Sequence, residues 1–214
     1  MVIAIDGPAG AGKSTVAQRI ARKLNMQYLD TGAMYRAFTL FVLQRGVPLE
    51  DVRGIEALLL DFEIVLDGEK VIMNGEDVTR EIRNDRVTDT VSYISSLGFV
   101  RKKMVELQRD IGNNRNVVAE GRDIGSVVFP DTMYKFYLDA AIDERAKRRI
   151  RDRKSSSDIT SLDEVMRRIK RRDAYDSNRD ISPLTKAPDA YCIDTTHMTI
   201  EEVCDHIISR IRKQ

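Results

Sequence analysis

Short runs of apolar residues alternate along the chain with longer stretches in which apolar residues recur every three or four positions. The first run, residues 2–5, is rich in β-branched residues, and residues 14–24 then place Val16, Ile20 and Leu24 on one helical face. The same alternation predicts strands at 26–29, 117–119, 133–138 and 191–193, and helices over 30–44, from 48 onwards, 100–111, 142–153, 161–180 and 199–212. Strands that alternate with helices predict an α/β fold with a parallel, doubly wound sheet, in which ligands bind at the carboxyl ends of the strands.

The pattern changes its period in the middle of the chain. Two apolar runs, 62–66 and 71–73, flank Asp67-Gly68, which is a strong signal for a β-hairpin. An antiparallel hairpin does not fit a parallel core, so we expect residues of about 62–95 to form an inserted lobe. The core then consists of residues 1–61 and 96–214. The helix ahead of the insert is expected to bury four apolar side chains: Ile55, Leu58, Leu59 and Leu60.

A glycine-rich segment lies between the first strand and the first helix. Residues 7–14 have the sequence Gly-Pro-Ala-Gly-Ala-Gly-Lys-Ser, which fits the phosphate-binding pattern G-x-x-x-x-G-K-[ST] in the context that this pattern requires. The glycines let backbone N–H groups and the helix N-terminus face anionic oxygens. Lys13 supplies a cation for the outer phosphates, and the Ser14 hydroxyl can coordinate Mg²⁺. An ordinary glycine turn is the alternative; the full motif in this context favours the binding of a nucleoside triphosphate.

The composition limits the partners and the compartment. Thirty-five Lys and Arg against 34 Asp and Glu give a formal net charge of +1, so no overall field attracts the chain to nucleic acid or to a membrane. Cys192 and Cys204 lie in apolar segments without metal-ligand spacing, and we expect both to be small buried side chains of a reduced, cytoplasmic protein. The sequence shows no signal-peptide pattern and no apolar run long enough to span a bilayer. His197 and His206 have no plausible catalytic partner nearby in sequence, so no histidine chemistry is expected.

Two polar clusters follow predicted strands. Asp30-Thr31-Gly32 comes after the second strand, and Arg36 lies one helical turn beyond Gly32, from where it can point back over the glycine-rich loop. Glu120-Gly121-Arg122-Asp123 comes directly after the apolar strand at 117–119. A solvated arginine is the alternative for Arg36, and a structural ion pair is the alternative for the second cluster. Packing explains an Arg-Asp pair at a strand end poorly, so we expect the second cluster to belong to a ligand site.

A third polar cluster lies on the last long helix before the final strand. Arg172, Asp176 and Arg179 are spaced at i, i+4 and i+7 and therefore share one face. Salt bridges along a helix surface are the ordinary explanation of this spacing. The surrounding window, residues 145–172, holds twelve Lys and Arg against four Asp and Glu, a local excess of eight positive charges. Because a phosphate site is already expected, we interpret this window as a basic flap over it.

Together these motifs resemble the bacterial cytidylate kinase family among the nucleoside-monophosphate kinases. The resemblance is carried by Ile5-Asp6-Gly7-Pro8-Ala9-Gly10-Ala11-Gly12-Lys13-Ser14-Thr15, Leu29-Asp30-Thr31-Gly32-Ala33-Met34-Tyr35-Arg36, Glu81-Ile82-Arg83, Gly121-Arg122-Asp123-Ile124-Gly125-Ser126-Val127-Val128-Phe129-Pro130 and Arg172-Asp173-Ala174-Tyr175-Asp176-Ser177-Asn178-Arg179. These motifs run in the expected order over essentially the whole chain. The combination is therefore far more specific than the glycine-rich loop alone, which would indicate only a superfamily.

The resemblance implies a three-layer P-loop kinase core with a parallel sheet. It also implies that the hairpin lobe binds the nucleoside monophosphate and that a helical lid spans about residues 145–165. The implied activity is transfer of the γ-phosphoryl group of ATP to CMP or dCMP, assisted by Mg²⁺, in pyrimidine metabolism. The implied partners are these small nucleotides, without nucleic acid or membrane, and the enzyme is expected to be a cytoplasmic monomer.

The resemblance also assigns roles to individual residues. The resemblance assigns the binding of ATP to Gly7, Pro8, Ala9, Gly10, Ala11, Gly12, Lys13, Ser14 and Thr15, and the coordination of Mg²⁺ to Ser14. It assigns the acceptor phosphate to Arg36, Arg122 and Arg179. It assigns cytosine to Ser92, Arg101 and Asp123, and the ribose to Arg172 and Asp176. Lys13, Arg122 and Arg179 would stabilise the transferring charge. Thr31 stands where a Ser or Thr is usual and is carried over as a contact on the acceptor side.

These residue types suit phosphoryl transfer, which needs alignment and cations around the equatorial oxygens. Three arginines offer rigid bidentate forks to a phosphate. The Asp123 carboxylate can accept from the exocyclic amine of cytosine while Arg101 donates to the ring, and uracil would present a carbonyl to Asp123, a discrimination on the order of several kcal/mol. No general base is needed because the nucleophile is an anionic phosphate oxygen, and a closing lid would exclude water.

Three other functional classes remain open from the sequence. A GTPase or ATPase switch would carry an Asn/Thr-Lys-x-Asp motif, but Thr185-Lys186-Ala187-Pro188-Asp189 has the wrong spacing. A small-molecule kinase of the shikimate or gluconate type would share the core but would not need the hairpin insert. A nucleic-acid-binding role for the basic window is disfavoured by the near-neutral total charge and the lack of interleaved aromatic residues.

Overall fold

The computed structural model describes residues 1–152 and 161–212. The chain divides into two compact units, the first formed by Met1–Tyr28 and Arg115–Gln214 and the second by Leu29–Asn114. The second unit contains the segment of about residues 62–95 that the sequence marks as an insert. Each unit carries some of the residues expected in the site.

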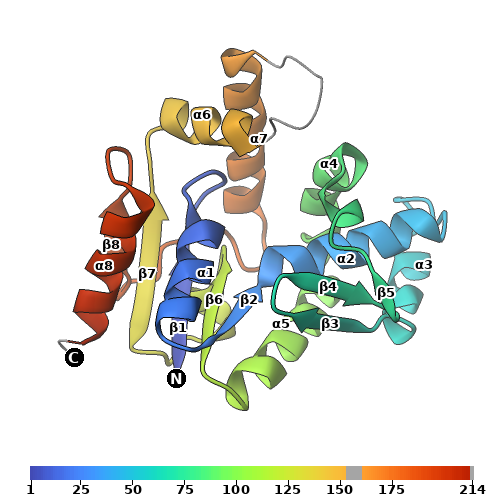
Figure 1. Ribbon diagram of the computed structural model, residues 1–214. Coiled ribbons are helices and arrows are strands. Elements are labelled where there is room, and N and C mark those ends of the chain that lie inside the picture. Colours follow the sequence, from blue (N-terminus) through green and yellow to red (C-terminus); the bar gives the residue numbers. More distant parts are fainter. Residues whose placement is uncertain (153–160, 213–214) are drawn as a thin grey trace. The chain divides into compact units, whose positions relative to one another are not determined.

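A five-stranded sheet forms the centre of the first unit, and its strand β2 leads into the second unit (Figure 1). In spatial order the strands are β2 (Gln27–Asp30), β6 (Val117–Gly121), β1 (Val2–Asp6), β7 (Tyr134–Asp139) and β8 (Tyr191–Asp194). β1 pairs in parallel with both of its neighbours, with Ala4 opposite Ala119 of β6 and Lys135 of β7, and β7 pairs in parallel with β8. The predicted α/β fold with a parallel sheet is therefore confirmed.

Helices α1 (Lys13–Lys23) and α8 (Ile200–Ile211) pack on this sheet. Ile3 and Ile5 of β1 point to the same side because side chains alternate along a strand, and both join Ile20 of α1 and Ile207 of α8 in one buried apolar cluster. α8 begins with a capping box, in which the side chains of Thr199 and Glu202 each accept from the backbone N–H group of the other residue. The cluster holds the start of α1, and with it the glycine-rich loop, on the end of β1.

A pair of helices, α6 (Ile142–Asp152) and α7 (Leu162–Asn178), lies beyond the carboxyl ends of the strands of the first unit (Figure 1). Ala146 of α6 and Ile169 of α7 pack with Ala9 of the glycine-rich loop in a second apolar cluster. Of the lid expected at about residues 145–165, residues 153–160 lie outside the described residues. The described parts of that segment belong to the end of α6 and the beginning of α7.

Helix α2 (Thr31–Gln44) is the central helix of the second unit and packs against α4 (Asp85–Ile94), α5 (Gly98–Asn113) and β4 (Lys70–Met73). The Asp30 carboxylate caps α2 by accepting from the backbone N–H of Ala33 at 2.8 Å, as the Asp-Thr sequence predicts. The buried Phe38 ring meets Phe62 edge to face, with 5.1 Å between the ring centroids. These contacts make the residues around the hairpin part of the core of this unit.

The predicted hairpin is confirmed and has a third strand. β3 (Ile64–Asp67) and β4 pair antiparallel with Asp67 opposite Lys70, and β5 (Glu76–Asp77) pairs with β4. Gly68 has φ +60°, a conformation that a two-residue hairpin turn requires. The sequence pattern misses β5 because two residues are too few to show alternation.

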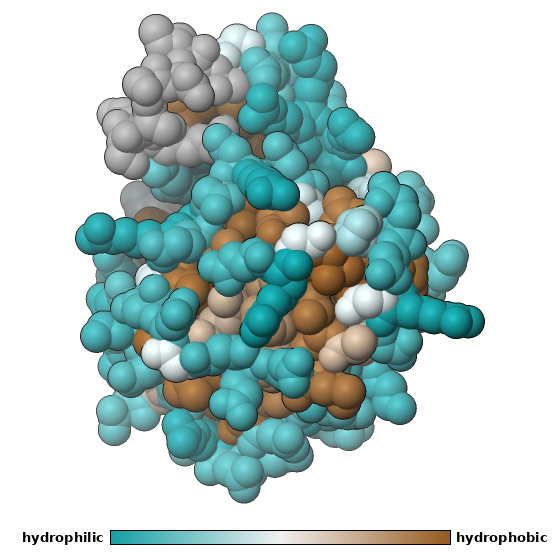
Figure 2. Space-filling model, turned by 90° about the vertical axis from the view of Figure 1, so that its right-hand side faces the viewer, coloured by the Kyte–Doolittle hydropathy of each residue, from teal (hydrophilic) through white to brown (hydrophobic). Residues whose placement is uncertain are grey.

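The expected apolar face of the helix after Pro48 is partly wrong. α3 (Val52–Ala57) begins later and buries Ile55, but a 3₁₀ turn, Leu58–Leu60, replaces its expected continuation. The tighter turn brings Leu60 out of phase with Ile55, and the Leu60 side chain is 89 % exposed. On the face drawn in Figure 2, apolar residues are interrupted by polar ones.

The expectation that both cysteines are buried is also wrong. Cys204 of α8 is buried in the apolar cluster, but Cys192 is exposed, because it points to the opposite side of β8 from the buried Ile193. Within the described ranges, every helix is too short or too polar to cross a membrane.

Candidate active site

The glycine-rich loop connects β1 to α1 in a conformation that only glycine adopts easily. Gly7 has φ +146°, and a Cβ atom there would lie 2.0 Å from the carbonyl oxygen of Leu138 on β7. Gly12 has φ +89° and is the N-cap of α1. The loop thus contacts β7 at Gly7 and leads at Gly12 into the N-terminus of α1, where backbone N–H groups favour the binding of anions. Ser14 and Thr15 follow in the first turn of α1 and are exposed.

Lys13 is buried at the beginning of α1, and its Nζ donates to the carbonyl oxygen of Pro8 at 2.8 Å. Burial is the main reason that its pKa falls to about 7, and the charges of Arg122 and Arg172 lower it further. The carboxylates of Glu120 and Asp6 oppose this shift. The ammonium charge is therefore poorly stabilised in this environment, and a phosphate group would raise the pKa again.

Ser14 and Glu120 form the oxygen-rich part of the site. The Ser14 hydroxyl donates to Glu120 Oε1 at 2.6 Å, and the Tyr28 hydroxyl donates to the same oxygen at 3.2 Å. A hydroxyl and a carboxylate are the hard oxygen donors that Mg²⁺ prefers, and Mg²⁺ needs few of them because it keeps waters and substrate phosphates as ligands. The described residues contain no group of three or more His, Cys, Asp and Glu that could hold a metal ion.

Three arginines of the first unit lie around the carboxylate of Asp176 on α7. Its Oδ2 accepts from Arg122 Nε at 3.0 Å and lies 3.9 Å from Arg172 Nε, while its Oδ1 lies 4.0 Å from Arg179 Nη1. The sequence places Arg179 on the helical face, but α7 ends at Asn178, and Arg179 is its extended C-cap with ψ 144°. Arg179 still reaches the cluster, and its Nε donates to the carbonyl oxygen of Ser182 at 2.6 Å.

Arg122 is partly buried among carboxylates. Burial alone would lower the pKa of its guanidinium, but the charges of Asp176, Asp173 and Glu120 outweigh burial and raise that pKa. Arg122 therefore remains a fixed positive charge. Its influence on the pKa of Lys13 indicates that the two cations lie in one electrostatic environment, as phosphoryl transfer requires.

The remaining site residue of the first unit, Asp123, follows Arg122 directly. Asp123 is buried, and its carbonyl oxygen accepts from Val127 at 2.9 Å and from Val128 at 3.1 Å. These bonds belong to a π-helical turn, Ile124–Val128, a rare conformation that is frequent at functional sites.

The second unit holds the other site residues expected from the sequence. Arg101 of α5 is buried, donates to the carbonyl oxygen of Ser95 at 3.1 Å and lies over the ring of Tyr35, 5.2 Å from its centroid. Ser92 also contacts Ser95, because the Ser92 carbonyl oxygen accepts from the Ser95 hydroxyl at 3.1 Å. Ser92 and Arg101 are thus each hydrogen-bonded to Ser95, Ser92 through its backbone carbonyl oxygen and Arg101 through its guanidinium.

Arg36 and Thr31 lie on α2. Arg36 Nη1 donates to the carbonyl oxygen of Ile82 at 3.1 Å and to the hydroxyl of Thr88 at 2.9 Å, so it is held by the segment that leads into α4. Thr31 is buried at the first residue of α2. The interpretation of Arg36 as a solvated arginine is wrong, since its guanidinium is half-buried and bonded.

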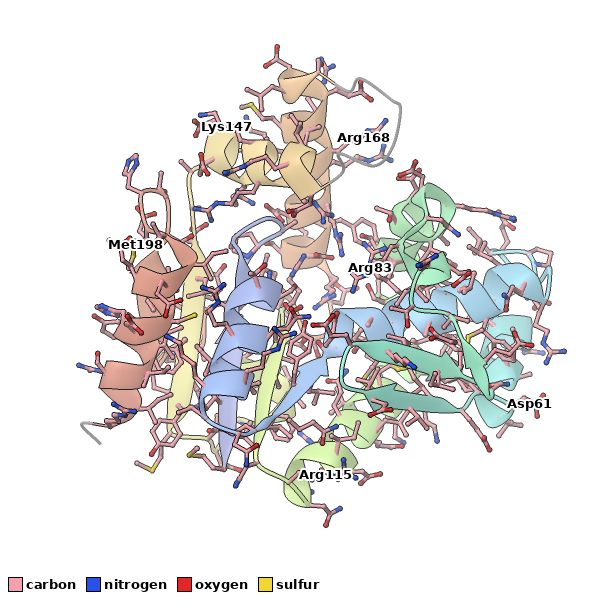
Figure 3. All side chains as sticks on the ribbon, in the orientation of Figure 1. Asp61, Arg83, Arg115, Lys147, Arg168 and Met198 are labelled. Atoms are coloured by element: carbon pink, nitrogen blue, oxygen red, sulfur yellow. The ribbon has the colours of Figure 1, made fainter. Side chains whose placement is uncertain are left out.

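The basic window has two kinds of arginine and lysine. Lys147 of α6 and Arg168 of α7 form exposed i, i+4 pairs with Asp143 and Glu164, and Figure 3 shows them on the helix pair. Arg145 and Arg148 behave differently, because they donate to carbonyl oxygens of the glycine-rich loop, those of Ala9 and Ala11.

The sequence pattern does not reveal the residues that bond α6 and α7 to the glycine-rich loop. Asp173 Oδ1 accepts from the backbone N–H of Ala9 at 3.0 Å, and its Oδ2 pairs with Arg145. Arg148 Nη1 also donates to the Thr195 hydroxyl at 2.9 Å. Asp173 lies inside a motif that carries the resemblance, but nothing in its spacing distinguishes it from a solvated helical aspartate.

The similarity to a known protein family extends over almost the whole chain. A family model described as Cytidylate kinase matches residues 3–213. The chain belongs to the cytidylate kinase family. Curated cytidylate kinases from Caldanaerobacter subterraneus and Fusobacterium nucleatum are 49 % and 45 % identical to it, over 99 % and 100 % of this chain and 94 % and 98 % of their own length.

A solved structure supports the fold independently. The crystal structure of an uncharacterized protein from Eubacterium ventriosum superposes with a TM-score of 0.56 at 15 % identity and covers 100 % of this chain and 99 % of that one. This likeness concerns the fold alone. Membership of the cytidylate kinase family confirms the family resemblance of the sequence motifs and argues against the regulatory switch and the nucleic-acid-binding module as alternatives.

Proposed function

We propose that this chain is an enzyme that transfers the γ-phosphoryl group of ATP to CMP or dCMP. The observation that carries the proposal is the shared environment of Lys13, Arg122 and Arg172 in a chain of this family. These cations lie close enough together to lower the pKa of Lys13, so their charges favour the binding of phosphate groups. Family membership then favours a pyrimidine nucleotide as the acceptor.

The donor side is formed by the glycine-rich loop. Backbone N–H groups of residues 7–15 would cradle the ATP phosphates, and Lys13 would leave the Pro8 carbonyl to contact the outer phosphates. Ser14 and Glu120 would hold Mg²⁺ together with the nucleotide, and the ion would neutralise charge on the transferring group. Arg145 and Arg148 of α6 supply further positive charge beside the loop.

The acceptor side is formed by arginines and carboxylates. Arg36, Arg122 and Arg179 would hold the CMP phosphate, because a guanidinium offers two parallel N–H donors to two phosphate oxygens. Arg172 and Asp176 would bind the ribose, since the Asp176 carboxylate can accept from sugar hydroxyls. Asp123, Arg101 and Ser92 would contact cytosine, with Asp123 accepting from its exocyclic amine, and Thr31 would complete the acceptor side.

The chemistry then requires alignment rather than covalent participation by the protein. An anionic oxygen of the CMP phosphate attacks the γ-phosphorus of ATP, the bond to the β,γ-bridging oxygen breaks, and ADP leaves. Lys13, Arg122 and Arg179 would stabilise the charge on the equatorial oxygens in this step. No side chain has to remove a proton, because the attacking oxygen is already ionised. Closure of the lid would exclude water and suppress ATP hydrolysis.

A panel of acceptors tests this proposal. ATP and Mg²⁺ are offered with CMP, dCMP, UMP, AMP and shikimate in one coupled assay that measures ADP formation. We expect CMP and dCMP to be the best acceptors and ADP formation to be slow without an acceptor. Preference for shikimate would favour a small-molecule kinase, and acceptor-independent hydrolysis would favour an ATPase. The monomeric state and the cytoplasmic location expected from the sequence remain predictions.

A further inference from the structure

Asp6 is a charged residue at the end of an otherwise apolar strand. It is the last residue of β1, directly before Gly7, and its side chain is buried. Its Oδ1 accepts from the backbone N–H of Ile124 at 2.8 Å, and its Oδ2 accepts from the backbone N–H of Gly125 at 2.8 Å. One carboxylate thus binds the first two N–H groups of the π-helical turn Ile124–Val128.

This turn fixes the backbone of Asp123. Asp123 is the residue before Ile124, and its carbonyl oxygen accepts from Val127 and Val128 within the turn. The Phe129 N–H donates back to the Ile124 carbonyl oxygen at 2.7 Å. Because Asp6 determines where the turn begins, it also determines the position from which the Asp123 side chain projects.

A second residue, Lys135, also packs against the turn. A Cβ atom on Gly125 would lie 3.1 Å from Lys135 Cγ and 3.5 Å from Asp6 Oδ2. Lys135 is itself buried and pairs with Asp189 at 2.6 Å. The turn is therefore closely packed against Asp6 of β1 and the stem of Lys135 on β7, and a Cβ atom at residue 125 would press on the Lys135 stem.

Burying the charge of Asp6 costs free energy, which argues against a role for this residue in packing alone. Burial raises its pKa to about 6, while the two N–H bonds and Lys13 oppose this rise and the charge of Asp123 adds to it. An asparagine would fill the same space without this burial penalty. An asparagine could not accept from both N–H groups, however, since its amide nitrogen is itself a donor.

We propose that Asp6 is a positioning residue that holds Asp123 in place to recognise the acceptor base, and this proposal rests on the function proposed above. Asp6 touches neither nucleotide in this role. It acts through the backbone of residues 124 and 125, and so links the end of the donor strand β1 to the selection of the acceptor.

Steady-state kinetics of Asp6→Asn test the proposal, with Asp51→Asn as the matched control. Asp51 also accepts from a backbone N–H at a helix start, that of Gly54 at 2.9 Å, but belongs to none of the proposed contacts. We expect Asp6→Asn to raise KM for CMP by about tenfold, the effect of one lost buried hydrogen bond, and to reduce the preference for CMP over UMP. KM for ATP should rise less than KM for CMP, because Asp6 acts on Lys13 only through its charge, and Asp51→Asn should match the wild type.

A double-mutant cycle separates positioning from a general loss of structure. If Asp6 acts through Asp123, Asp6→Asn should change KM for CMP little in an Asp123→Ala background, whereas independent effects would multiply. Gly125→Ala disturbs the same turn with the carboxylate intact and should reproduce the rise in KM. It also serves if Asp6→Asn does not fold. Multiplying effects, or equal rises in KM for CMP and ATP, would overturn the proposal.

Amide hydrogen exchange measured without nucleotide tests the structural role of Asp6 independently of which substrate the enzyme uses. The Ile124 and Gly125 amides should exchange at least about tenfold faster in Asp6→Asn and at the wild-type rate in Asp51→Asn. Unchanged exchange would overturn the role of Asp6 even if CMP is the substrate. If the wild type prefers another acceptor, the proposed function fails, and the KM comparison is made with that acceptor.

Discussion

At the scale of single residues, Lys13 shows how the site is prepared for phosphate. Its Nζ donates to the Pro8 carbonyl, yet burial and the neighbouring arginines hold its pKa near 7 instead of the usual 10.5. At pH 8 the folded protein therefore carries mostly neutral Lys13, about nine-tenths by the size of the shift. A bound triphosphate places negative charge beside Nζ and should return the pKa to well above 8.

We predict that binding of a non-hydrolysable ATP analogue at pH 8 takes up about one proton, because Lys13 becomes charged as the phosphates arrive. Isothermal titration calorimetry in buffers of different ionisation enthalpy measures this number directly. At pH 6 Lys13 is already charged, so the uptake assigned to it should fall close to zero. Equal uptake at both pH values would assign the proton to another group.

Arg179 leads to a second prediction at this scale. Its side chain is 5 % exposed, and its guanidinium lies between Asp176 and the Ser182 carbonyl oxygen. Arg179→Met should raise KM for CMP by about ten- to a hundredfold, the loss of a charge-assisted contact, with little change in KM for ATP. Steady-state kinetics with each substrate varied in turn measure both constants.

Arg168→Met is the control for this change, since Arg168 lies on α7, the helix that Arg179 caps, in an exposed pair with Glu164. Its kinetics should match those of the wild type. Unchanged KM for CMP in Arg179→Met would return Arg179 to the interpretation as a structural salt bridge.

At the scale of elements, short sequence signals predict the features that depend on neighbouring residues alone, such as helix caps and hairpin turns. Asp30 caps α2 and Gly68 turns the hairpin because each acts within three residues of itself. Leu60 differs from the prediction because a switch from α-helical to 3₁₀ geometry leaves no mark in an apolar run. Cys192 differs because a strand of four residues is too short to reveal which of its faces is buried.

The parts of the site that the sequence did not reveal depend on partners far along the chain. Asp6 bonds to residues 118 and 119 positions later, and Asp173 bonds to Ala9 across 164 positions. No periodicity or spacing records such contacts; they exist because the parallel sheet brings the ends of β1 and β6 to one edge. The sequence does predict Arg122 and Asp123 as site residues, because a charged pair directly after an apolar strand is poorly explained by packing.

The junction between β1 and the glycine-rich loop gives a prediction about an element. At Gly7 both the φ of +146° and the contact with the Leu138 carbonyl oxygen exclude a side chain. Gly7→Ala should therefore lower the free energy of unfolding by about 3 kcal/mol or more, because the loop must move away from β7. Urea unfolding followed by circular dichroism measures the change.

Gly46→Ala provides the matched comparison. Gly46 also has a positive φ, +66°, but a Cβ atom there would have no neighbour within 4 Å. This variant should lose only the conformational term, about 1 kcal/mol. Equal losses in the two variants would mean that φ alone, and not the contact with β7, fixes the loop at Gly7.

At the scale of the whole molecule, the fold of the first unit brings several cations close to one another. The sheet, α1 and α7 bring Lys13, Arg122 and Arg172 into one environment, although the chain as a whole is almost neutral. Like charges that lie close together repel each other, which is why Arg122 and Arg172 lower the pKa of Lys13. The arrangement is understandable in a molecule whose substrates are anionic.

The stability of the whole protein should therefore depend on pH through Lys13. In the unfolded chain Lys13 holds its proton up to about pH 10.5, whereas in the folded protein it releases the proton near pH 7. Between these values the unfolded state binds more protons, so the free energy of unfolding rises with pH, by up to about 1.4 kcal/mol per pH unit for this one group. Lys13→Met removes the titrating group, and the difference between wild type and variant isolates its contribution. Urea unfolding at pH 7, 8 and 9 should show the wild type gaining stability relative to Lys13→Met, and a constant difference would mean that Lys13 keeps its ordinary pKa in the fold.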